Sequence, residues 1–117
     1  VISIVADSLW KHPARENVLY ISEDGFDLSF HAHRALSRNR LIHCMGLHTF
    51  VAQTDLGRGG TWDGTLRNLK AGWSPVFCYQ DGSRASQELQ QMGAVGICIE
   101  ELNNFLLLPT VENSFFY

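Results

Sequence analysis

Short apolar segments alternate with segments of helical periodicity along this chain, and that alternation constrains its fold more than any other feature. The apolar segments span residues 1–6, 18–22, 49–53, 75–79 and 95–99. Runs of this length, rich in β-branched residues, are typical of strands covered on both faces. Strands joined through helices by short connections form parallel sheets. We therefore expect an α/β fold with a parallel sheet of about five strands and flanking helices.

The helical segments are recognised by apolar residues spaced three or four apart and by the residues at their ends. Gly72 and Gly93 are expected to end two of these helices, and Ser83 to begin one. Residues 24–33 fit either a loop or a short strand. The expected helices span residues 33–45, 61–71, 84–92 and 100–107.

The length of 117 residues, with 45% hydrophobic content, is that of one globular domain. We assign residues 1–109 to this domain and residues 110–117 to a C-terminal tail. About five strands is a small number for this fold class, and the chain opens on a strand-like run at Val1. We therefore expect an incomplete piece of a larger domain.

The charge balance excludes a broad positive surface for DNA, because nine Lys and Arg residues face twelve Asp and Glu residues. Any anion site must therefore be local, and five arginines lie between positions 34 and 67. No apolar stretch reaches the roughly 20 residues that span a bilayer. We expect a soluble, cytoplasmic protein without membrane contact.

Metal, cofactor and hydrolase signatures are lacking. Cys44, Cys78 and Cys98 are far apart in apolar surroundings and are expected to be buried, reduced thiols. The histidines follow no ligand spacing and are expected at the surface. No nucleophile elbow is present, so no catalytic triad is expected. We predict neither a metal nor a cofactor.

A glycine-rich segment, Gln53–Trp62, follows one expected strand and enters the next helix. Ligands of open α/β sheets bind at such carboxyl ends, where glycine amides and a helix N-terminus attract anions. Thr61 can add a hydroxyl, and Trp62 can stack on a base. The segment is neither a dinucleotide fingerprint nor a P-loop, and a plain tight turn is the alternative. The candidate phosphate-binding residues here are Gly57, Arg58, Gly59, Gly60 and Thr61.

Arg38-Asn39-Arg40 lies in the preceding expected helix. Residues two apart point about 200° away from each other on a helix, so one arginine can face a ligand while the other faces solvent. A solvated helix face is the alternative interpretation.

Together these motifs resemble the DprA/Smf family of DNA-processing proteins. The matching runs are Arg38–Ile42, Thr49–Ala52, Gly57–Thr61 and Leu69–Phe77, with Ser22-Glu23 and Gly93-Ala94 at corresponding places. The resemblance implies a Rossmann-like domain that binds single-stranded DNA and helps to load a recombinase. It assigns phosphate contacts to Arg38, Arg40, Gly57, Gly59, Gly60 and Thr61, with Asn39 as an orienting hydrogen-bonding residue.

A related group, the LOG-type nucleotide phosphoribohydrolases, has Gly-Gly-x-Gly-Thr loops at the same place. Those enzymes have a glutamate three residues beyond the loop threonine. Gly64 occupies that position here, and Asp63 is one residue early. We therefore expect no catalytic residue and rank a nucleotide-handling enzyme or sensor second to DNA binding, with an inactive fragment third. An open sheet edge also predicts a homo-oligomer.

Overall fold

A computed structural model of the chain describes residues 1–23, 25 and 27–102. The chain divides into two compact units, Val1–Ile42 and His43–Tyr117, and each is described by itself. Both units contain parallel strands accompanied by helices, so the expected α/β class is confirmed. The five strands lie in two separate sheets of two and three strands. None of the described helices is long and apolar enough to cross a membrane.

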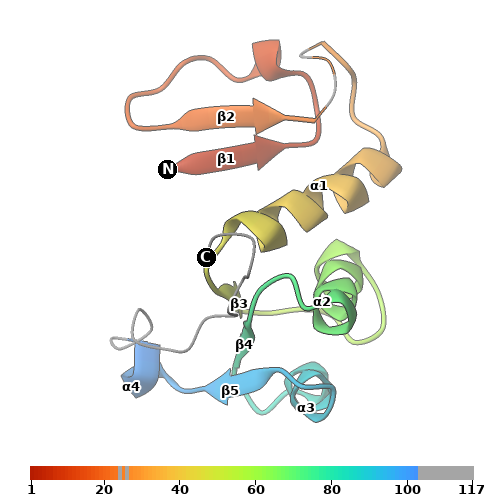
Figure 1. Ribbon diagram of the computed structural model, residues 1–117, viewed down its shortest axis with the longest axis vertical. Helices are drawn as coiled ribbons and strands as arrows, with labels where there is room; N and C mark the ends of the chain where they lie inside the picture. Colours follow the sequence, from red (N-terminus) through yellow and green to blue (C-terminus); the bar gives the residue numbers. More distant parts are fainter. Residues whose placement is uncertain (24, 26, 103–117) are drawn as a thin grey trace, which may run out of the picture. The chain divides into compact units, whose positions relative to one another are not determined.

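In the first unit, β1 (Ile2–Val5) and β2 (Leu19–Ser22) lie side by side and point in the same direction (Figure 1). A short 3-10 helix, η1 (Leu9–Lys11), belongs to the connection between them. The helix α1 (Ala32–Met45) follows β2. Its first eleven residues belong to this unit, because the boundary between the units falls after Ile42.

The second unit contains a three-stranded parallel sheet with the order β3-β4-β5. Its strands are β3 (Thr49–Val51), β4 (Val76–Tyr79) and β5 (Val95–Ile97). Between them run α2 (Gly60–Ala71) and α3 (Arg84–Gln91), and α4 (Ile99–Leu102) follows β5. Parallel pairing of neighbours in this order requires a crossover helix after each strand, as α2 and α3 provide.

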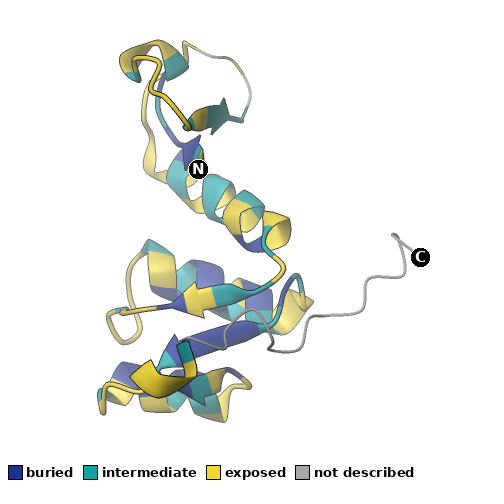
Figure 2. Ribbon diagram, turned by 90° about the vertical axis from the view of Figure 1, so that its left-hand side faces the viewer, coloured by how far each residue is buried: buried dark blue, intermediate teal, exposed yellow. Residues whose placement is uncertain are grey.

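The core of this unit lies between the sheet and its two crossover helices. Alternate residues of β4, Val76 and Cys78, face the core, because successive side chains of a strand point to opposite faces. Trp62 of α2 and Leu89 of α3 pack into the same cluster, so both helices cover one face of the sheet. Figure 2 shows β4 buried along most of its length.

A buried polar group, Asn68 of α2, fixes this helix to the segments before β3 and β4. Its side chain is fully buried and its Nδ2 donates to Ser74 Oγ at 3.0 Å and to His43 Nδ1 at 2.9 Å. Its Oδ1 accepts from the backbone amide of Ser74 at 3.0 Å. Buried amides require such partners, because an unmet donor or acceptor costs about 1–3 kcal/mol.

Several local predictions are confirmed. Gly72 adopts a left-handed conformation (φ 71°, ψ 37°) and ends α2, with its amide donating to the Asn68 carbonyl. Ser83 caps α3 and accepts from the Ser86 amide at 3.1 Å. Residues 25 and 27–31 form no strand, so that part of the segment left undecided is a loop. The tail 110–117 and most of the helix expected over 100–107 lie outside the described residues.

Two expectations about side-chain burial are wrong in part. Cys78 is buried as expected, but Cys44 is exposed and Cys98 is half-buried. His43 is buried, although all histidines were expected at the surface. Burial raises the pKa of the Cys78 thiol, which favours an unreactive thiol.

Candidate functional site

The glycine-rich segment forms an exposed turn between β3 and α2. Gly57 and Gly59 have φ values of 74° and 89°, a region that side chains with a Cβ rarely adopt. No atom within 4 Å would meet a Cβ at either position. The backbone conformation at these two positions therefore requires glycine, and the space beside them is open.

The first turn of α2 presents uncapped amides. Gly59 is the N-cap and provides no side-chain hydrogen bond. The Asp63 amide donates to the Gly59 carbonyl at 3.0 Å, which is the first bond of the helix. The amides of Thr61 and Trp62 precede this bond and have no hydrogen-bond partner among the described residues. Because they lie at the positive end of the helix dipole, they suit an anion.

The charges around the turn cancel in pairs. Arg58 Nε lies 3.5 Å from Asp55 Oδ2, and Arg67 Nε lies 3.0 Å from Asp63 Oδ2. The side chain of Arg58 is 81% exposed, so its pair with Asp55 is weak and can be exchanged for another anion. The positive character of the turn therefore comes chiefly from the backbone amides.

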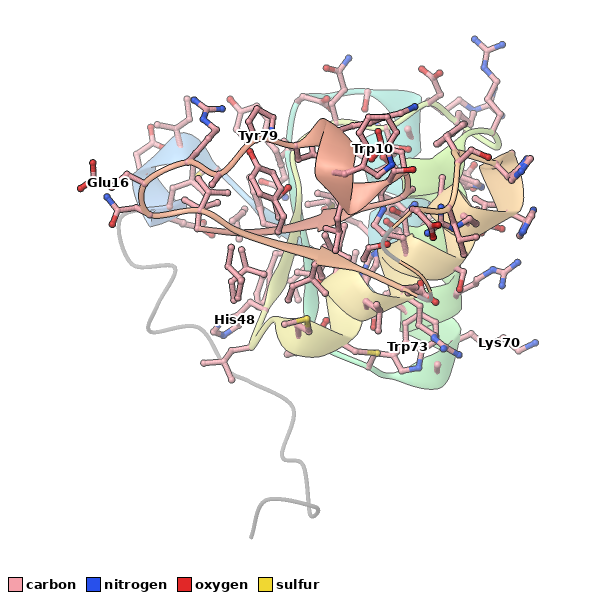
Figure 3. All side chains as sticks on the ribbon, turned by 90° about the horizontal axis from the view of Figure 1, so that it is seen from above. Trp10, Glu16, His48, Lys70, Trp73 and Tyr79 are labelled. Carbon is pink, nitrogen blue, oxygen red and sulfur yellow. The ribbon has the colours of Figure 1, made fainter. Side chains whose placement is uncertain are left out.

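We expected the side chain of Trp62 to be exposed, because this residue lies beside the turn, but it is buried. It is 8% exposed and belongs to the core cluster of the second unit. Base stacking at Trp62 is therefore excluded in this conformation. Of the three tryptophans, Trp10 is the exposed one, at 67%, and its ring lies beside η1 (Figure 3).

The Arg-Asn-Arg run belongs to the first unit. Arg38 Nη1 donates to the Ile4 carbonyl at 2.8 Å, and its Nε donates to Asn39 Oδ1 at 3.1 Å. Arg38 thus attaches α1 to the end of β1, and Asn39 orients it. Arg40 is exposed. The other candidate phosphate-binding residues lie in the second unit: Gly57, Arg58, Gly59, Gly60 and Thr61.

A cavity of about 310 Å³ in the first unit lies where β1 and β2 end. Val5 of β1 lines it, as do Glu23 after β2 and Arg34 of α1. The sequence analysis predicted no site here, although two lining residues, Glu23 and Arg38, belong to motifs that resemble the DprA/Smf family.

Arg34 has the most hydrogen bonds of the arginines in the first unit. It is 8% exposed, and its two terminal nitrogens donate to Ser22 Oγ and to three backbone carbonyls. The three carbonyls belong to Glu23, Leu28 and Ser29. Arg34 therefore holds the segment after β2 against α1 and fixes one wall of the cavity.

The cavity at the carboxyl ends of β3 and β4 is much smaller. Thr54, Asp81 and Ser83 are among its lining residues, and its volume is about 10 Å³. A volume near that of a single water probe cannot enclose an organic ligand. This cavity therefore has no room for an organic ligand, which leaves the surface of the glycine turn as the candidate site considered in this unit.

Comparison with protein-family models, with curated proteins and with solved structures finds no match to this chain.

Proposed function

We propose that this chain is a binding protein of the DprA/Smf type that holds the phosphates of single-stranded DNA at its glycine turn. The observation that carries the proposal is the start of α2, where Gly59 and Thr61 are exposed and the Thr61 and Trp62 amides have no partner among the described residues. A phosphate oxygen is a ligand suited to such amides. Arg58, exposed beside them, supplies a guanidinium.

A polynucleotide suits this site better than an enclosed nucleotide. The site is a surface turn, and the neighbouring cavity of about 10 Å³ has no room for a base or a sugar. The chain also lacks the carboxylate that LOG-type enzymes use for nucleotide hydrolysis, because Gly64 occupies its position and the neighbouring Asp63 is paired with Arg67. Binding without turnover is therefore the function we propose. The family resemblance adds the expectations of a recombinase partner and a cytoplasmic location, and the open sheet edges add that of self-association.

The substitution Thr61→Asp tests this proposal directly. An aspartate in the first turn interacts favourably with the helix dipole, by about 0.3–1 kcal/mol, so α2 keeps its stability. Its negative charge lies where the phosphate would bind. We therefore expect the affinity for a fluorescent oligothymidine to fall about tenfold or more in anisotropy titrations at low salt.

The matched control is Gln87→Glu, which adds the same charge to an exposed position of α3. It should bind oligothymidine as the unmodified chain does. Equal affinities of the Thr61→Asp variant and the control would contradict the proposal. The salt dependence then separates the ligands, because contacts to several phosphates of a strand weaken steeply with ionic strength, whereas a single mononucleotide on a locally neutral turn weakens less.

A further inference from the structure

The cavity of the first unit contains polar groups that the proposed function does not use. It lies at the carboxyl ends of β1 and β2, the edge where parallel α/β sheets bind ligands. Its volume of about 310 Å³ is within the range of small-molecule sites. Val5, Ala6 and Leu28 give it an apolar wall, and Glu23, Arg34 and Arg38 add charged groups.

Two buried side-chain atoms of residues that line this cavity have no hydrogen-bond partner within the described residues, and they indicate which groups a ligand would need. They are the acceptor Oε1 of Glu23 and the donor Nε of Arg34. Arg34 is more than nine-tenths buried, and its other nitrogens are already bound. A buried polar atom without a partner costs about 1–3 kcal/mol, a cost that a bound ligand would remove.

The charges at this cavity are also not neutralised by one another. Over residues 1–23, 25 and 27–102, the ion pairs within 4.0 Å involve other side chains, and none includes Glu23, Arg34 or Arg38. Glu23 receives a hydrogen bond from Ser37, 3.0 Å from its Oε2, but no cationic partner. A carboxylate and a guanidinium thus face the same cavity, each able to accept an opposite charge.

We propose that this cavity binds a free α-amino acid with an apolar side chain. The ammonium group donates to Glu23 Oε1, and the carboxylate accepts from Arg34 Nε. The side chain packs against Val5, Ala6 and Leu28. An inorganic anion would satisfy only the guanidinium, and an amine would satisfy only the carboxylate. The zwitterion supplies both charges in one molecule of suitable size.

Calorimetric titration of the full chain tests this site, with L-leucine as the probe. Two analogues of L-leucine serve as controls: 4-methylpentanoate lacks the ammonium group, and 3-methylbutylamine lacks the carboxylate. We expect L-leucine to bind, and each analogue to bind about tenfold more weakly or not at all. Absence of L-leucine binding at about 10 mM, or equal affinity for all three compounds, would overturn the proposal.

Glu23→Gln provides a second test, because it keeps the shape of the side chain and removes its charge. We expect the L-leucine affinity to fall about tenfold and that of 4-methylpentanoate to stay unchanged. Glu16→Gln, at an exposed position of the same unit, should have no effect. An unchanged L-leucine affinity in Glu23→Gln would refute the site. Thr61→Asp should bind L-leucine normally, so failure at one site leaves the other site standing.

Discussion

Among the arginines of α1, hydrogen bonding decides which side chain is available to a ligand. Arg34 and Arg38 both donate to backbone carbonyls, from segments that precede α1. Arg40 is exposed. In the sequence these three residues form one positive cluster. The structure assigns two of them to holding the first unit together, so local charge alone does not identify a phosphate contact.

Arg34 is expected to stabilise the first unit through its four hydrogen bonds. Its planar guanidinium donates to four acceptors, and an ammonium group cannot reproduce that geometry. We expect Arg34→Lys to lower the free energy of unfolding by about 2 kcal/mol or more, because three partly buried carbonyls and one hydroxyl lose hydrogen bonds from a charged donor. Urea unfolding followed by circular dichroism measures this change. The control Arg40→Lys, at an exposed position, should have a free energy of unfolding within about 0.5 kcal/mol of that of the unmodified chain. Equal urea midpoints for the two variants would contradict the role assigned to Arg34.

Among the elements, α2 has two ends that differ in how they are stabilised. Its start is a glycine turn without a side-chain cap, and its end is the left-handed Gly72. Its middle is held by Asn68, whose amide contacts His43 and Ser74. The hydrogen bonds of Asn68 and the left-handed Gly72 stabilise α2, although its first turn has no side-chain cap.

The pH dependence of stability follows from His43 in this network. Burial lowers the pKa of His43 from its ordinary value of 6.5, and its Nδ1 faces the Asn68 Nδ2 donor. The folded chain therefore binds a proton less readily than the unfolded chain. Stability from this group is complete above pH 6.5 and falls as the pH drops below that value, until the folded-state pKa is reached.

Urea unfolding at a series of pH values checks this expectation. Three carboxyls have a lowered pKa: Asp7 through its hydrogen bond with His12, Asp81 through its hydrogen bond with Ser83, and Glu100 through its hydrogen bond with Cys98. They lose their contributions only in more acidic solution. In His43→Gln the loss of stability between about pH 7 and pH 5.5 should be smaller. A slope that is identical in His43→Gln would show that another group is responsible.

Local signals in the sequence predicted the elements well, and predicted long-range contacts poorly. The caps at Gly72 and Ser83 are properties of a few consecutive residues, so they could be identified directly. Trp62, Leu66 and Leu69 are spaced four and three residues apart, so they share one face of α2, and that face packs in the core. We expected an exposed indole at Trp62 because the residue is close to the glycine turn, and this expectation was wrong. The contacts of Arg34 and of Asn68 involve residues distant in sequence, which no local pattern indicates.

At the scale of the whole molecule, two units carry two distinct candidate sites. The glycine turn belongs to the unit His43–Tyr117, and the charged cavity belongs to Val1–Ile42. Both lie at the carboxyl ends of parallel strands, which is where this fold class places its ligands. Parallel pairing was predictable from the alternation of strands and helices. The division into two sheets was not, because the spacing of strands does not specify which strands pair.

Amide chemical shifts of the 15N-labelled chain report residue by residue on phosphate binding at the start of α2. Titration of the 15N-labelled chain with oligothymidine should shift the Thr61 and Trp62 amide resonances most, and in Thr61→Asp the shift of the Trp62 amide at the same oligothymidine concentration should be much smaller. If oligothymidine leaves both resonances in place while it shifts others, or shifts none, the glycine turn is not the phosphate site.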